Sequence, residues 1–295
     1  MPETLGSVID YVTNQLQGFT TDNPMYGTLT QVAQDEDLEL VIELPAQSEP
    51  VGVVEIGAEL IHIGSYDADT HIATVPAWGR AQMGTTATAH ALGSKVTVNP
   101  RFPRNRVALV INQVIQGMCP PLFGVEHDEV TVQTLQWDYA LPTGTRNLLR
   151  VEWRPYDSSS FDWTPVRSAY IKRTSGAPLL HLPDALTSHS GSAVRFTVAT
   201  NPTALTDEAD LFTDSGLPES CIDIVSLGAI PRLITTAELA RQQLTSVEVS
   251  ERSTLVPASS GTAVARFYMQ QYEARLESEA MRLRQEYPLT MMRNM

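Results

Sequence analysis

The C-terminal region of this 295-residue chain holds the feature that most restricts its fold, a long amphipathic helix expected over residues 259–287. Ser259 and Ser260 stand where side-chain oxygens cap a helix, and Pro288 ends it. Apolar side chains recur between them three or four residues apart, at Val264, Tyr268, Tyr272, Leu276, Ala280, Leu283 and Tyr287. About 28 residues, at about 1.5 Å per residue, make a rod of roughly 40 Å. A rod of this kind is typical of a scaffold rather than of a catalytic centre.

The outer face of this helix is expected to carry charged pairs. Arg275 with Glu279, and Arg282 with Glu286, have the four-residue spacing that brings opposite charges together on a helix surface.

Three further helices are predicted from apolar periodicity. They cover residues 3–17, 103–118 and 221–243, and Pro231 is expected to kink or divide the third.

Two regions favour β-structure. Residues 38–44 read as a strand after a polar loop around 22–27, and residues 51–98 read as a meander with strands near 52–56, 59–64 and 71–76. Gly57-Ala58 and residues 65–69 supply its turns. Between 128 and 200 the period returns to two, which predicts an antiparallel β-sandwich with Trp153, Trp163 and Tyr170 in its core.

The predicted fold class is therefore α+β. A helical bundle is built from the N-terminal, middle and C-terminal helices, and a small β-meander domain and an antiparallel β-sandwich are inserted into it. The expected segments are an N-terminal helix with an acidic arm (1–50), the meander domain (51–100), a bundle helix (101–125), the sandwich insertion (126–205), and a C-terminal helical bundle with the last helix and a tail (206–295).

Charge is distributed unevenly along the chain. The net charge is −14, and residues 1–79 hold 13 acidic residues and neither Lys nor Arg. A surface of one sign either repels nucleic acid, attracts a basic partner or simply aids solubility. Sequence-specific DNA binding is disfavoured because it needs clustered Lys and Arg. No apolar run is long enough to span a membrane, and the N-terminus has no signal-peptide pattern.

Motifs for catalysis are absent from the sequence, so we expect no enzyme, no cofactor and no metal. It contains no G-x-S-x-G, phosphate loop, H-E-x-x-H or Cys-x-x-Cys. Asp67 and Asp69 with His62 and His71 can ligate a cation, but a hairpin tip explains them better. Residues 126–129, Glu-His-Asp-Glu, are better explained as a solvated charged turn than as a metal site. His90 is expected to bind backbone in a tight loop, and Cys119 and Cys221 to be core thiols.

Residues 59–96 resemble a small β-domain common in tailed-bacteriophage virion proteins. The resemblance rests on Glu59, Leu60, Ile61, Gly79, Gly84, Thr85, Ala87, His90, Gly93 and Val96, and Trp78 departs from it. The C-terminal region, with Leu-Gly-Ala-Ile-Pro-Arg-Leu at 227–233 and Arg-Leu-x-x-Glu-Tyr-Pro at 282–288, is similar to head-to-tail connector (adaptor) proteins of long-tailed phages. Together the two resemblances cover about a third of the chain.

The resemblance implies a structural virion protein of the neck, assembled in the host cytoplasm. Its partners would be copies of itself in a ring of twelve, the portal protein above, and neck or tail proteins below. The expected ring and portal contacts are Val264, Tyr268, Tyr272, Leu276, Leu283, Tyr287, Met291, Met292 and Arg293. DNA would pass without sequence-specific binding through a channel lined by Asp35, Glu36, Asp37 and Glu39.

The alternative is a tail-tip, baseplate or minor tail protein. In that case the β-sandwich would bind a host glycan or receptor through aromatic side chains.

Overall fold

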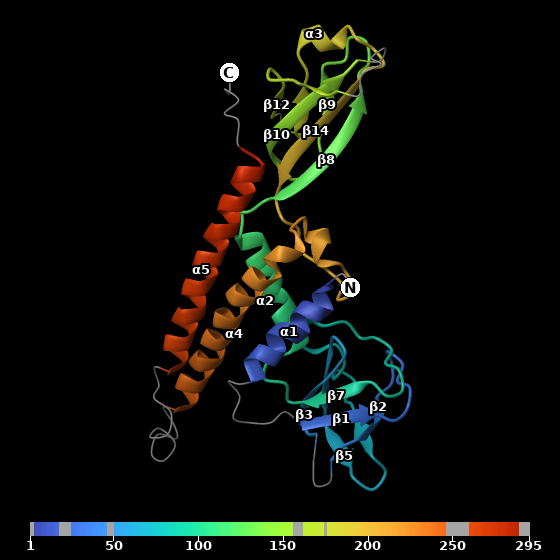
Figure 1. Cartoon of the computed structure of the whole chain (residues 1–295). Coiled ribbons are helices and arrows are strands. Elements are labelled where there is room, and N and C mark those ends of the chain that lie inside the picture. Colours follow the sequence, from blue (N-terminus) through green and yellow to red (C-terminus); the bar gives the residue numbers. More distant parts are fainter. Residues whose placement is uncertain are drawn as a thin grey trace. The chain divides into compact units, whose positions relative to one another are not determined.

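The computed structural model describes residues 3–17, 25–45, 50–155, 162–173, 176–245 and 260–288. Within these ranges the protein is α+β, with five α-helices and three antiparallel sheets (Figure 1). The chain groups into two compact units. The first unit draws on the ranges 1–8, 112–228 and 266–295, and the second on 9–111 and 229–265.

The first unit contains two antiparallel sheets, one at the β8, β10 and β14 labels of Figure 1 and the other at the β9 and β12 labels. A four-stranded sheet runs in the order β11-β10-β14-β8, and a three-stranded sheet in the order β12-β13-β9. Their strands are β8 (Gly124–Thr131), β9 (Asp138–Ala140), β10 (Thr145–Arg154), β11 (Thr164–Pro165), β12 (Tyr170–Lys172), β13 (Leu179–His181) and β14 (Ala193–Thr200). Side chains from both sheets share one core, which includes Tyr139, Leu180, Val194 and Phe196. The predicted antiparallel strands are confirmed.

The second unit is built on a seven-stranded antiparallel sheet in the order β4-β3-β7-β1-β2-β6-β5. Its strands are β1 (Met25–Leu29), β2 (Glu39–Glu43), β3 (Gly52–Ile56), β4 (Glu59–Ile63), β5 (Ser65–Asp67), β6 (Ile72–Thr74) and β7 (Lys95–Val98). Its buried core includes Leu29, Ile42, Ile56, Ile61 and Val96. The predicted two-residue turn at Gly57-Ala58 is confirmed, because Ile56 pairs with Glu59 and Gly57 has φ +60°.

Three strands of this sheet were not predicted, namely β1, β5 and β7. Residues 25–29, read as part of a polar loop, form β1, which pairs with both β2 and β7. A Cβ on Gly27 would lie 2.5 Å from Leu44 Cδ2 and 2.7 Å from the Glu43 carbonyl, so this glycine permits close strand approach rather than marking a loop. Residues 65–67, read as a turn, form β5, and the Tyr66 hydroxyl donates to the Ile42 carbonyl at 3.0 Å.

The N-terminal and middle helices form as their periodicity predicts. Helix α1 (Leu5–Gln17) buries Leu5, Val8, Ile9, Val12 and Leu16. A reciprocal cap starts it, since Thr4 N donates to Ser7 Oγ and Ser7 N to Thr4 Oγ1. Helix α2 (Arg104–Gly117) buries Val107, Val110, Ile111, Val114 and Ile115. The short helix α3 spans Asp184–Thr187.

The two C-terminal helices are also confirmed. Helix α4 (Ile222–Thr245) is not divided at Pro231, and the alternative expectation, a kink there, stays a prediction. Helix α5 (Ser260–Glu286) has 27 residues, and Tyr287 N still donates to the Leu283 carbonyl beyond its end. Ser259 lies outside the described residues. The five-segment division of the chain and the bundle with insertions stay predictions.

The aromatic side chains expected in the sandwich core are only partly buried. Trp153 packs against the core, but Trp163 is half-buried and Tyr170 is 45% exposed. The ring of Trp163 lies under two guanidinium groups, those of Arg154 and Arg195, at 4.8 and 4.4 Å from the ring centroid. Cation–π contacts thus cover this ring where core packing was expected.

Candidate functional site

The apolar stripe of α5 faces the interior of the first unit at its central positions. Tyr272, Ala280 and Leu283 are buried, and Tyr268, Leu276, Tyr287 and Val264 are half-buried. The predicted stripe is therefore real, but much of it is already occupied within the chain. Whether any of it contacts another copy or a portal stays a prediction. Met291, Met292 and Arg293 lie outside the described residues.

A close approach of three helices fixes the middle of α5. A Cβ on Gly228 of α4 would lie 2.8 Å from Val114 Cγ1 of α2 and 2.9 Å from Tyr272 Cε2 of α5. Glycine at this position lets the helices meet at less than the ordinary side-chain distance.

Glu279 is the charged residue that sequence reasoning misplaced. It was expected on the outer face of α5, yet it is only 4% exposed. Arg275 and Arg282 donate to its carboxylate, at 3.3 and 2.9 Å, and Ser220 Oγ does so at 3.2 Å. Arg275 also pairs with Asp223 of α4 at 2.7 Å. The Arg282 hydrogen bond, followed by that of Arg275, lowers the pKa of Glu279 despite its burial. The expected pair of Arg282 with Glu286 is confirmed at 2.8 Å.

The outward surface of α5 keeps large apolar side chains in solvent. Phe267 is 57% exposed and Met281 52%. Phe267 and Met281 are fourteen residues apart, which is close to four helical turns, so they lie near one face. The sequence pattern pointed to the buried stripe and did not single out these residues.

The four residues predicted to line an acidic channel lie in the second unit, before and within β2. Asp35, Glu36 and Glu39 are exposed and Asp37 is half-exposed. A turn holds them in place, because Gln34 N donates to Asp37 Oδ2 at 2.7 Å. Arg80 reinforces this turn, since its Nη1 donates to the Gln34 and Asp37 carbonyls at 2.8 and 3.0 Å.

A buried charged cluster stands behind this turn. Glu59 of β4 is 1% exposed and accepts two hydrogen bonds from Arg80, at 2.8 and 2.9 Å. The His90 ring lies 2.8 Å from the same carboxylate. Ala81 N and Thr88 N donate to it as well. The prediction that the His90 side chain binds backbone is wrong: a carboxylate is its partner, and only its main chain pairs with Ala33.

The electrostatics of this cluster favour an ionised carboxylate. Burial alone would raise the pKa of Glu59. The hydrogen bonds from Arg80, His90 and two backbone amides outweigh burial and lower that pKa to about 2. Both carboxylate oxygens of Glu59 accept hydrogen bonds from protein groups. This arrangement suits a structural role rather than proton transfer to a substrate.

The cation-site candidates do not assemble. Among the described residues, no three His, Cys, Asp or Glu side chains gather as a metal site. His62 stacks on Trp78 with centroids 4.7 Å apart, whereas His71 lies 3.1 Å from the Tyr66 hydroxyl. Residues 126–129 were expected in a turn and instead lie within β8, because β8 pairs with β14 along its whole length.

The two cysteines differ in environment. Cys221 is buried, as expected, and burial raises the pKa of its thiol to about 12. Cys119 is half-buried rather than a core thiol, and Arg146 Nη1 lies 2.7 Å from its Sγ.

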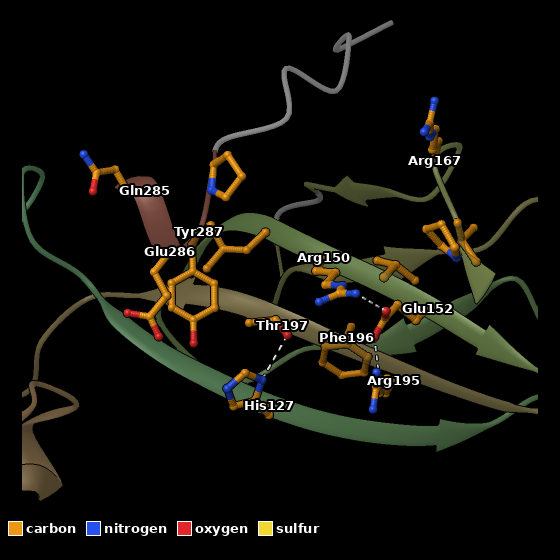
Figure 2. Close-up of a pocket in the computed structure, with 15 residues that line it drawn as sticks. His127, Arg150, Glu152, Arg167, Arg195, Phe196, Thr197, Gln285, Glu286 and Tyr287 are labelled. Atoms are coloured by element: carbon orange, nitrogen blue, oxygen red, sulfur yellow. Dashed lines mark hydrogen bonds and ion pairs between the residues drawn. The ribbon is translucent and has the colours of Figure 1, made fainter. Parts of the chain in front are cut away.

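A pocket of about 1020 Å³ opens over the four-stranded sheet of the first unit (Figure 2). Strands β10, β14 and β8, the end of α5 and the segment around β11 line it. Tyr287 and Glu286 stand at one end beside His127, whose Nδ1 lies 2.9 Å from Thr197 Oγ1. Arg167 lies at the opposite end.

The floor of the pocket carries an ion triplet. Glu152 is 4% exposed and lies between Arg150 and Arg195, each with a nitrogen 2.5 Å from one of its oxygens. Sequence reasoning missed this pocket. Only the tertiary fold brings the end of α5 beside the arginines of β10 and β14.

No protein family and no curated protein matches the chain. Among the solved structures that match, the neck of an empty GTA particle, computed with C6 symmetry, contains a similar chain. The match is 14% identical, covers 55% of this chain and 74% of the other, and has a TM-score of 0.22. A TM-score of 0.22 does not establish a shared fold. Within the described ranges, no helix combines the length and apolarity that crossing a bilayer requires.

Proposed function

We propose that this protein is a non-enzymatic structural protein of a phage-like virion neck, a head-to-tail adaptor that forms a ring beneath the portal. The observation that carries the proposal is the two-sided character of α5. One side is fixed by buried contacts at Gly228, Tyr272 and Glu279, while Phe267 and Met281 keep apolar surface in solvent. Exposed apolar side chains on a rigid element suit protein–protein contact. The sequence resemblance at residues 227–233 and 282–288 supports the same role.

In this proposal the helices form a bundle into which the β-meander domain and the β-sandwich are inserted. Neighbouring copies contact each other through two different surfaces. Repeating this contact closes a ring when the rotation between neighbours is a whole fraction of a full turn. The proposed partners are further copies of the chain, twelve by resemblance, the portal protein, and downstream neck or tail proteins.

The channel of such a ring must let DNA pass without holding it. The first 79 residues carry 13 acidic side chains and no Lys or Arg. Phosphates find no cation to bind on such a surface, because nonspecific DNA affinity comes from Lys and Arg contacts that release counterions. We propose that acidic side chains of this region, with Asp35, Glu36, Asp37 and Glu39 among the candidates, face the channel.

Location within the particle tests the proposal most directly. Electron microscopy of virions labelled with an antibody against this chain should place the label at the neck. Label at the tail tip would overturn the proposal and favour the alternative, a receptor- or glycan-binding role for the sandwich. Mass photometry of the purified chain with portal particles supplies a second readout, in which a ring bound to the portal is expected.

A further inference from the structure

The pocket over the four-stranded sheet has more cationic groups than its own carboxylates neutralise. Arg150, Arg167 and Arg195 line it, against Glu152 and Glu286. Arg150 and Arg195 each place one nitrogen near Glu152, and their side chains remain 65% and 45% exposed. A guanidinium has five N–H donors, so each keeps donors for a second carboxylate. Arg167 is exposed and has no ion pair among the described residues.

The arginines are also held in orientation. Glu152, almost fully buried, fixes one edge of the Arg195 guanidinium, and the Trp163 ring lies 4.4 Å from its carbon. A stacked and paired guanidinium loses less entropy when it binds a planar carboxylate. The pocket is thus a preformed site for carboxylates.

The charges favour an acidic protein segment over nucleic acid. Glu152 and Glu286 lie within the pocket and repel every anion, so a polyphosphate with its many charges is disfavoured more than the two carboxylates of a short turn. A short acidic turn meets fewer of these charges and fits a pocket of about 1020 Å³ between sheet and helix end.

The chain itself supplies an acidic turn of this kind. Asp35 and Glu36 are exposed, and no ion pair with either is found among the described residues. Their turn is rigid, because Arg80 donates to the carbonyls of Gln34 and Asp37 while Asp37 accepts from Gln34 N. A rigid acidic turn loses little entropy on docking.

We propose that the turn at Asp35 and Glu36 of one copy docks into the arginine pocket of a second copy. The two surfaces differ, so the contact is heterologous, and repeating it builds a ring or a filament. The inference rests on the proposed ring function and names the contact that would join its subunits. In a ring joined in this way Asp35 and Glu36 lie in a neighbour's pocket, and the other acidic side chains of residues 1–79 are the ones that line the channel.

Cross-linking between labelled copies tests the contact. The full-length Arg167→Lys variant is prepared in unlabelled and ¹⁵N-labelled form, and equal parts are mixed. The protein concentration is about 1 mM, which is the order of the effective concentration between linked binding sites. A carbodiimide then joins the lysine to any contacting carboxylate. The expected product is a mixed-isotope peptide that links position 167 to Asp35 or Glu36. Cross-links within one copy only, or no association at this concentration, would overturn the proposal.

Charge reversal gives a second, independent readout. Glu36→Lys should weaken self-association about tenfold in sedimentation velocity, as expected for loss of a close charge pair. Adding Arg167→Glu to the same chain should restore it. The matched control Asp69→Lys makes the same charge change at an exposed hairpin tip and should leave association unchanged. An equal effect from Asp69→Lys would overturn the proposal.

Failure of this contact and failure of the neck function are distinguishable. If Glu36→Lys protein enters the neck of particles at the wild-type level, the proposed contact is wrong and the neck function stands. If wild-type protein is absent from the neck, the function itself fails, whatever the cross-linking shows.

Discussion

The hydrogen bonds around Glu59 explain how the second unit fixes the conformation of its long loops. Five hydrogen bonds converge on its carboxylate, from Arg80, His90, Ala81 and Thr88. Arg80 extends the network to the turn at residues 34–37 and to the Thr88 carbonyl. The left-handed conformation of Ala81 and Met83, at φ 54° and 53°, is maintained beside this cluster. A buried network that satisfies its polar groups fixes one arrangement of the chain.

Replacing Glu59 with Gln should destabilise the protein strongly. The substitution keeps the shape but leaves the buried Arg80 guanidinium without its counter-charge, at a cost of about 3 kcal/mol. Thermal unfolding followed by circular dichroism measures the loss. The matched control is Glu36→Gln, an exposed carboxylate that should change stability little. Wild-type stability for Glu59→Gln would show that the cluster does not hold the fold.

The same residue predicts a pH dependence. The pKa of Glu59 is about 2 in the folded chain, against an ordinary value of 4.5. A carboxyl whose folded pKa is depressed stabilises the fold above its unfolded pKa and loses that contribution as pH falls toward the folded value. Stability should therefore fall between about pH 4.5 and pH 2, and Glu59→Gln should flatten that part of the curve. Denaturant unfolding at stepped pH values checks it.

At the scale of elements, helix α5 has one face buried within the chain and another face exposed to solvent. Tyr272 is 6% exposed and Phe267 57% exposed, although both are aromatic residues of the same helix. Tyr272→Asp should unfold or loosen the first unit, because it places a charge against Gly228 of α4. Phe267→Asp should leave the circular dichroism spectrum intact and reduce incorporation into particles. Normal incorporation of Phe267→Asp would remove this face of α5 from the assembly role.

Helix contact at Gly228 predicts an unusual result for alanine. Alanine is intrinsically the better helix former by about 1 kcal/mol. Its Cβ would nevertheless lie 2.8 Å from Val114 Cγ1, so we expect Gly228→Ala to destabilise by about 1–3 kcal/mol through overpacking. Chemical denaturation measures the difference. The control Ser278→Ala, at an exposed position of α5, should be neutral or slightly stabilising.

The helices were predictable from sequence because their apolar periodicity is local. The stripes of α1 and α2, and the 27 residues of α5, follow directly from spacings of three and four. Strands β1 and β5 were missed because Gly27 and the polar residues 65–69 look like turn signals unless the neighbouring strands are known. Glu279 was misplaced for a related reason. Its carboxylate can be buried because Ser220, Arg275 and Arg282 donate hydrogen bonds to it, and the sequence alone does not show that Ser220 lies beside it.

For the whole molecule, the site depends on residues distant in sequence. The pocket joins β10 and β14 to the end of α5, and no pattern in the sequence relates Arg195 to Tyr287. The sequence did indicate the acidic region, because charge is a property of composition. The purified chain should therefore show no retention of duplex DNA at physiological salt, which electrophoretic mobility shift measures. Retention would contradict an acidic channel through which DNA slides freely.

The burial of Arg80 has a practical consequence for the folded chain. It is the first basic residue in the sequence, its side chain is 8% exposed, and the next basic residue is Lys95. Trypsin cuts only after Lys and Arg, so native protein offers this protease no accessible site in its first 94 residues. Limited digestion should release an intact N-terminal portion of more than 90 residues, whereas denatured chain should yield a peptide ending at Arg80. The appearance of that shorter peptide would then serve as a sensitive report that the cluster around Glu59 has opened.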